Sequence, residues 1–171
     1  MHPILQKLTG GDRRSIGRAN EVAEEIVADS ALFAIVLEGL FHEDPIIRMR
    51  AADAIEKASI KRPDLLQPHR PTLLNKVAAI RQQEVRWHLS LILPRLRLDT
   101  AELEQVLAIL DDHLRDRSAI VRVNAMQALA DLAMQYDHIR PSVIQRLEGL
   151  TKTGSPAMAA RGRKLLKTLM G

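Results

Sequence analysis

Small and apolar residues recur along the chain with the spacing of one buried face of an α-helix. In each of five segments they fall at positions 0, +4, +7 and +8 from an anchor residue. The segments repeat at a nearly constant interval of roughly 36 residues, which is typical of α-solenoids. The anchors are Ser15, Ile47, Val85, Val121 and Met158.

The stretches between these segments carry the signals of a second set of helices. Ser or Asp stands before several apolar runs, where it can cap a helix, and Pro stands where a first helical turn is expected. The pattern predicts about ten helices in five antiparallel pairs, with no strand. We expect a single domain, 1–171, with repeats at about 1–28, 29–62, 63–99, 100–138 and 139–171. The intervening helices are expected near 3–8, 30–41, 71–81, 101–114 and 141–150.

One motif within these segments resembles HEAT repeats of the compact bacterial type. It reads Asp44-Pro45-x-Ile47-Arg48-x-x-Ala51-x-x-Ala54-Ile55, and 85–93 and 121–129 repeat its core. The resemblance covers nearly the whole chain but is weak in the first and last repeats. Tetratricopeptide repeats have a similar period and rank second, because their Trp…Leu-Gly…Tyr pattern is absent.

The resemblance implies a right-handed α-solenoid, a superhelix whose second helices line the concave side. The Arg one position after the anchor (Arg48, Arg86 and Arg122) is then expected to contact acidic residues of neighbouring turns, such as Asp44 or Asp116. The residues expected on the concave, partner-binding face are Met49, Asp53, Trp87, Leu91, Val123, Met126 and Gln127. The alternative is that this stripe belongs partly to the core between repeats. Pro94 is expected to kink the helix of the third repeat or to end it.

Composition narrows the fold class and the chemistry. The chain has no Cys and only 2% aromatic residues, which argues against disulfides, thiolate metal sites and aromatic-rich β-folds. The net charge of +4 is unevenly distributed. Residues 1–140 are nearly neutral, whereas 141–171 carry six Lys and Arg against one Glu. We therefore expect a basic patch on the last helix, formed by Arg161, Arg163, Lys164 and Lys167, which is either a solvated cap or a contact for phosphate or acidic groups.

No catalytic or metal-binding motif stands out. The segments 42–44 and 111–113 hold His beside acidic residues, but both fit solvated turns or helix ends better than metal sites. Trp87 and Asp53, with nearby Arg and His, weakly resemble the DNA-binding groove of the HEAT-like alkylpurine DNA glycosylases. Phycobilin lyases have similar repeats, but no residue here indicates a bilin site. We expect no enzyme activity, no cofactor and no metal.

The sequence thus favours a non-enzymatic scaffold or adaptor that binds another protein or a peptide segment in its concave groove. One alternative is a nucleic-acid-binding protein, including a DNA glycosylase-like enzyme, and another is a bilin-lyase-like protein. Apolar solenoid ends would also permit a homodimer. No segment has the length of a membrane span or the pattern of a signal peptide, so we expect a cytoplasmic protein without membrane contact.

Overall fold

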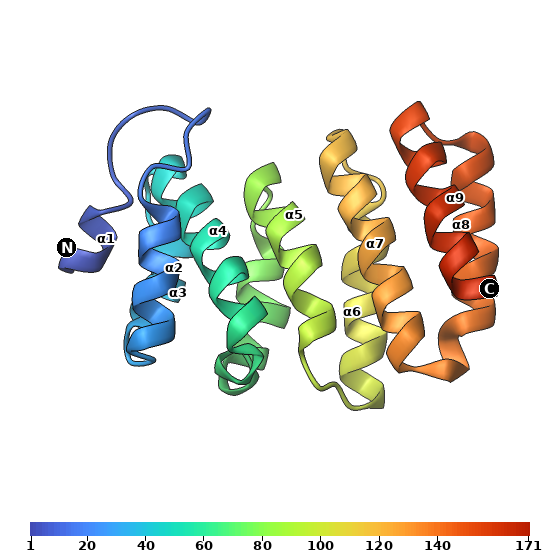
Figure 1. Cartoon of the computed structure of the whole chain (residues 1–171), viewed down its shortest axis with the longest axis horizontal. Coiled ribbons are helices and arrows are strands. Elements are labelled where there is room, and N and C mark those ends of the chain that lie inside the picture. Colours follow the sequence, from blue (N-terminus) through green and yellow to red (C-terminus); the bar gives the residue numbers. More distant parts are fainter. The chain divides into compact units, whose positions relative to one another are not determined.

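A computed structural model describes all residues of the chain, 1–171, and divides it into two compact units (Figure 1). Unit 1 comprises Met1–Arg97 and unit 2 comprises Leu98–Gly171. Both are built from helices and contain no strand, so the all-helical fold class is confirmed. The boundary falls close to the predicted end of the third repeat, and a single continuous domain stays a prediction.

In unit 1, helix α4 packs against α2 on one side and α5 on the other, while α3 and the 3-10 turn η1 also pack against α4. The α-helices are α1 (Pro3–Gln6), α2 (Ala19–Ala28), α3 (Leu32–Glu38), α4 (Pro45–Lys61) and α5 (Gln83–Ile92). The short 3-10 or π turns are η1 (Gly39–Phe41), η2 (Pro63–Leu65), η3 (Gln67–His69), η4 (Thr72–Lys76), η5 (Val77–Ala79) and η6 (Leu93–Arg95).

In unit 2, helix α9 packs against both α7 and α8, and α6 packs against α7. The elements are α6 (Thr100–His113), α7 (Ala119–Gln135), η7 (Asp137–Ile139), α8 (Arg140–Thr153) and α9 (Pro156–Met170). The predicted small residue at Gly162 permits the close approach of α8 and α9. A Cβ atom there would lie 1.9 Å from Oγ1 of Thr151, so no larger residue fits without movement.

The predicted caps of α4, α7 and α9 and the core positions of α4 and α7 are confirmed. The predicted anchor of the first repeat, Ser15, is instead exposed and lies outside any helix, because α2 begins only at Ala19. Asp44 accepts from the Ile46 amide at 2.8 Å, and the Ser118 and Ser155 hydroxyls cap α7 and α9 in the same way. Side chains at positions 0, +4, +7 and +8 of α4 and α7 are buried: Ile47, Ala51, Ala54, Ile55, Val121, Ala125, Ala128 and Leu129. Burial of this apolar face is the main stabilising term for both helices.

The structure departs from the sequence prediction at 71–81 and agrees with one of the two predictions for Pro94. The predicted regular helix at 71–81 is instead the π turn η4 followed by η5. Pro71 has a helical backbone conformation just before η4, and Pro is tolerated in a first helical turn, so the proline does not account for the irregularity. Helix α5 ends at Ile92, immediately before the 3-10 turn that contains Pro94. Of the two predicted outcomes for Pro94, the helix end is the one observed.

The Arg that follows the anchor makes the same contact in both units. Nη1 of Arg48 donates to the backbone oxygens of His42 and Glu43 at 2.7 and 3.0 Å. Nη1 of Arg122 donates to those of Asp116 and Arg117 at 2.7 and 2.9 Å. Arg122 thus contacts Asp116, one of the expected acidic residues, and Arg48 contacts Glu43 rather than Asp44. In both cases the acceptor is the backbone oxygen and not the carboxylate. Each guanidinium thereby fixes the turn before its own helix.

Arg50 is buried in unit 1 and organises the loop between α1 and α2. Its guanidinium donates to five backbone oxygens of this loop at 2.6–3.3 Å, those of Leu8, Thr9, Gly10, Asp12 and Ser15. The loop passes so close that a Cβ at Gly17 would lie 2.9 Å from Cζ of Arg50, and Gly17 has a φ of +54°. The loop therefore depends on both a buried cation and a residue without a side chain.

Replacing Arg50 with Met should destabilise the protein by about 3–5 kcal/mol, because five buried or half-buried carbonyls lose their charged donor. Urea unfolding measures the change, with Arg13→Ala as the control, since Arg13 is exposed and has no side-chain partner. The control should stay within about 0.5 kcal/mol of the wild type. Equal stability of the two variants would contradict the role assigned to Arg50.

Candidate protein-binding surface

The structure places the predicted unit 1 residues on α4 and α5 but exposes only some of them. Met49 and Asp53 of α4 are each only 7% exposed, whereas Trp87 and Leu91 of α5 are half-buried. Met49 therefore does not offer the exposed side chain that the sequence analysis expected, because α2 and α5 pack along both flanks of α4.

The predicted residues of α7 lie in unit 2 and are less accessible than expected. Met126 is fully buried, and its Cε would lie 3.3 Å from a Cβ at Gly162 of α9. Its predicted place in an exposed apolar stripe is thus corrected, since the close packing of α9 on α7 covers it. Val123 and Gln127 are half-buried. Gln127 donates to Asp131 and accepts from Arg161, both at 3.0 Å.

A network of polar side chains joins the three helices α2, α4 and α5. Nζ of Lys57 contacts Oδ2 of Asp53 at 2.7 Å and Oδ1 of Asn20 at 2.6 Å. On the other side, Nε2 of His88 lies 3.7 Å from Oδ1 of Asp53. Asp53, which was expected on the partner-binding face, thus serves mainly to connect α4 with its neighbours.

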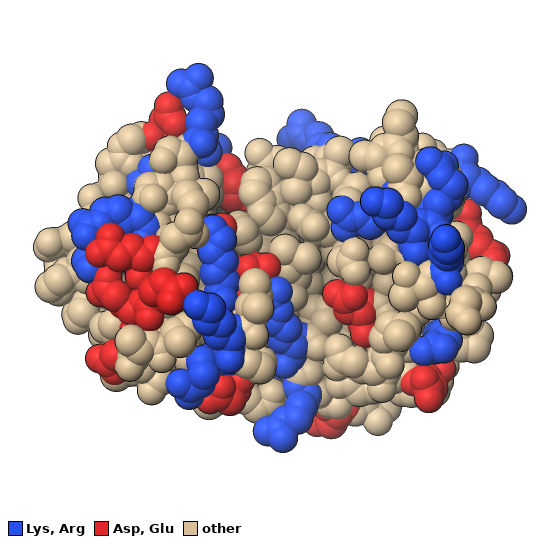
Figure 2. Space-filling model, in the orientation of Figure 1, with Lys and Arg blue, Asp and Glu red and all other residues tan.

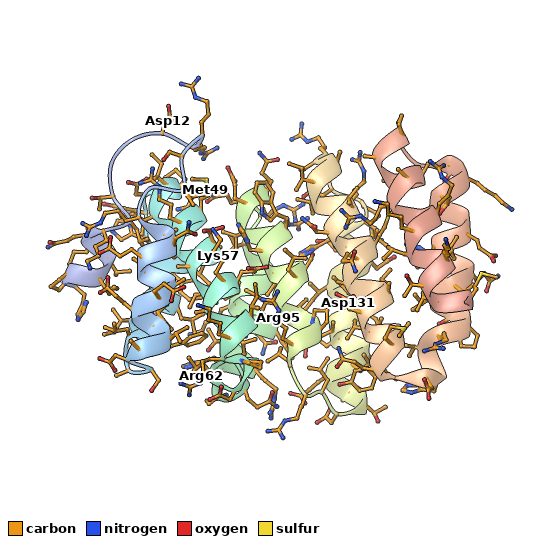
Figure 3. All side chains as sticks on the ribbon, in the orientation of Figure 1. Asp12, Met49, Lys57, Arg62, Arg95 and Asp131 are labelled. Carbon is orange, nitrogen blue, oxygen red and sulfur yellow. The ribbon has the colours of Figure 1, made fainter.

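Arg95 extends this network at the end of α5. Its guanidinium lies 3.2 Å from Oε1 of Glu56 and donates to the Glu56 backbone oxygen and the Ser59 hydroxyl at 2.7 and 2.8 Å. Lys57 and Arg95 lie on the side of α4 and α5 that faces the viewer in Figure 3. The cations on this side of unit 1 are therefore already paired with carboxylates of the same unit.

A slot opens between α2 and α4 beside this network. It has a volume of about 370 Å³ and is lined by Asn20, Ala23, Glu24, Val27, Lys57, Ile60 and Lys61. Ile60 is 62% exposed, and the ion pair between Lys61 and Glu24, at 2.8 Å, bridges the two helices. Ile60 was not predicted as a binding residue, because it lies beyond the repeating positions 0 to +8 that follow the anchor Ile47.

Helix α5 leaves a single line of side chains accessible. Between Glu84 and Arg95 only Trp87, Leu91 and Arg95 are more than marginally exposed, and they stand four residues apart on one face. We call the accessible residues Lys57, Ile60, Lys61, Trp87, Leu91 and Arg95 the open face of unit 1. It combines an aromatic and two aliphatic side chains with three cations.

His88 lies beneath this face in an unusual environment. It is 9% exposed, and its Nδ1 atom is buried without a hydrogen-bond partner. Burial lowers the pKa of His88 to about 4, and the nearby Asp53 carboxylate opposes this shift only in part. The imidazole is consequently neutral at pH 7.

A second cavity, of about 280 Å³, lies in unit 2 among α6, α7 and α8. It is lined by Leu107, Asp111, Leu114, Leu129, Ser142, Val143 and Arg146. Hydrogen bonds from Arg115 and Arg146 lower the pKa of Asp111. The Asp111 carboxylate at this cavity is therefore paired with two arginines.

The comparisons add no assignment to this geometry. No family model matches the chain, and no curated protein matches it. The structure contains no group of three or more His, Asp or Glu side chains suited to a metal ion. None of its helices has the length and apolar character needed to cross a membrane.

The buried state of His88 predicts a pH-dependent loss of stability. Unfolded chains bind a proton at this residue near pH 6.5, whereas the folded protein does so only near pH 4. The unfolding free energy should therefore fall as the pH drops through this window, by about 2 kcal/mol between pH 7 and pH 5.

Urea unfolding of His88→Gln at both pH values isolates this contribution, and His138→Gln serves as the control because His138 is exposed. The His88 variant should lose less stability on acidification than the wild type, whereas the control should behave like the wild type. An identical pH dependence in both variants would contradict the assignment.

Proposed function

We propose that this chain is a non-enzymatic HEAT-like solenoid protein that binds a segment of another protein on the open face of unit 1. The observation that carries the proposal is the line of Trp87 and Leu91 on α5, the only accessible apolar side chains of that helix. Half-buried Trp side chains are preferred anchors of protein interfaces, since they bury a large area at little entropic cost.

The repeated contacts of Arg48 and Arg122 support the solenoid part of the proposal. Two helices in different units, each of 17 residues, begin with a side-chain cap and bind the preceding turn through an equivalent guanidinium. Such recurrence of a local interaction is typical of proteins built by stacking one supersecondary unit.

The chemistry of the open face indicates the kind of partner. The α2–α4 slot has an apolar part at Val27 and Ile60 that suits one aliphatic or aromatic side chain. Trp87 and Leu91 offer a second apolar contact on α5. A peptide segment with two separated apolar anchors therefore fits this surface better than a compact charged ligand does.

The polar groups of the open face argue for binding rather than catalysis. Lys57, Lys61 and Arg95 each form an ion pair, and the buried His88 has a pKa of about 4, well below that of a general base poised for neutral pH. The same pairing disfavours nucleic acid at this face, because phosphate would have to compete with a carboxylate for every cation.

Replacing both Trp87 and Leu91 with Ala should weaken capture of the partner by at least 30-fold, the effect expected on losing about 2 kcal/mol at an interface centre. Quantitative capture from a native lysate compares this variant with the wild type and with Ile120→Ala. Ile120 is 54% exposed on α7, outside the open face, and serves as the matched apolar control.

The proposal holds if a protein captured by the wild type and by the control is lost with the double variant. It fails if every captured protein is retained by the double variant. Sedimentation velocity of all three proteins covers the remaining alternative, a homodimer. A dimer that dissociates only in the double variant would identify a second copy as the occupant of this face.

A further inference from the structure

Helix α9 carries a group of cations that the proposed function does not use. It contains Arg161, Arg163, Lys164 and Lys167 and no acidic residue. Arg163, Lys164 and Lys167 are exposed, and none of them forms an ion pair or a side-chain hydrogen bond. Figure 2 shows Lys and Arg side chains gathered over unit 2 in the region of α9.

Several cations on other helices are instead held in ion pairs. Lys57 and Lys61 of α4 pair with Asp53 and Glu24, and Arg115, at the end of α6, pairs with Asp111. On α9 only Arg161 is held, by the Gln127 side chain of α7 at 3.0 Å. The free cations of α9 thus concentrate positive potential that no carboxylate of this helix neutralises.

The exposed side chains beside these cations are mostly small, while Leu165 is buried and Leu166 is half-buried. Ala157, Ala160 and Thr168 are exposed on the same helix, and the one large exposed apolar residue, Met170, lies at its last position. Protein interfaces depend on aromatic or aliphatic anchors at their centre, and this face has no aromatic side chain and no fully exposed aliphatic one among its cations. Contacts to a phosphate backbone need only cations that approach closely.

We propose that α9 binds the phosphodiester backbone of double-stranded DNA without reading its sequence. Arg163 and Lys167 stand one helical turn apart, about 6 Å along the axis, so both can contact phosphates of one strand. A duplex fits better than a single strand, because single-strand sites stack bases on aromatic side chains and α9 has none. This binding surface is separate from the open face of unit 1 and shares no residue with it.

Fluorescence anisotropy with a labelled 20-base-pair DNA tests the proposal over a series of KCl concentrations. The logarithm of wild-type affinity should fall with the logarithm of salt concentration with a slope of about −3, as expected for three phosphate contacts. The combined variant Arg163→Gln, Lys164→Gln and Lys167→Gln should bind at least 30-fold more weakly in low salt, with nearly all of the slope lost.

The matched control is the combined variant Arg13→Gln, Lys76→Gln and Arg117→Gln. These three cations are also exposed and without side-chain partners, so the control removes the same charge from other surfaces. It should keep most of the affinity and the slope. Circular dichroism of both variants checks that the helices are retained.

Three results would overturn the proposal. The first is no binding of the duplex by the wild type at 20 mM KCl. The second is an equal loss of affinity in both variants, which would mean that DNA binding depends on the net charge of the protein and not on α9. The third is tighter, α9-dependent binding of a poly-glutamate peptide or of single-stranded DNA, which would assign the face to an acidic protein or to an unpaired strand.

Discussion

The contact between an arginine and the turn before its helix recurs in both units and sets the position of the residues that follow. Arg48 and Arg122 each bind two backbone carbonyls of the turn just before α4 and α7. Because each helix is rigid, fixing its first turn also fixes residues three turns later, including Lys57 and Ile60. The geometry of the open face therefore depends on a contact at the other end of α4.

Two arginines of unit 1, Arg50 and Arg95, hold its elements together and are not available as reactive groups. The Arg50 guanidinium donates hydrogen bonds to five carbonyls of one loop. Arg95 joins the end of α5 to Glu56 of α4. With these groups satisfied, the features left for a partner are the apolar side chains Trp87, Leu91 and Ile60. By contrast, Arg163, Lys164 and Lys167 of α9 are exposed and form no ion pair. We accordingly propose a protein segment for the first surface and DNA for the second.

Periodicity and cap signals predicted the helices α4, α6, α7 and α9, since these follow from short-range rules. Periodicity also predicted the buried side of α4, α7 and α9. It did not predict how tightly neighbouring helices approach. Met126 was expected in a groove, but Gly162 allows α9 to pack against it. A helical pattern also does not encode the irregular turns η4 and η5, nor the loop around Arg50, which depends on Gly17 and on long-range contacts. Ile60 was not predicted as a binding residue because it lies in the last turn of α4, outside the repeating positions.

The central claim is that a partner protein contacts the open face of unit 1, and site-specific photocrosslinking in the native cell tests it most directly. A photoreactive amino acid at position 91 would sit on the accessible line of α5, and the same probe at position 120 would sit on exposed α7. The account predicts one discrete crosslinked protein from position 91 and none of that mass from position 120. Crosslinking of this protein from position 120 alone, or no adduct from position 91, would contradict the account.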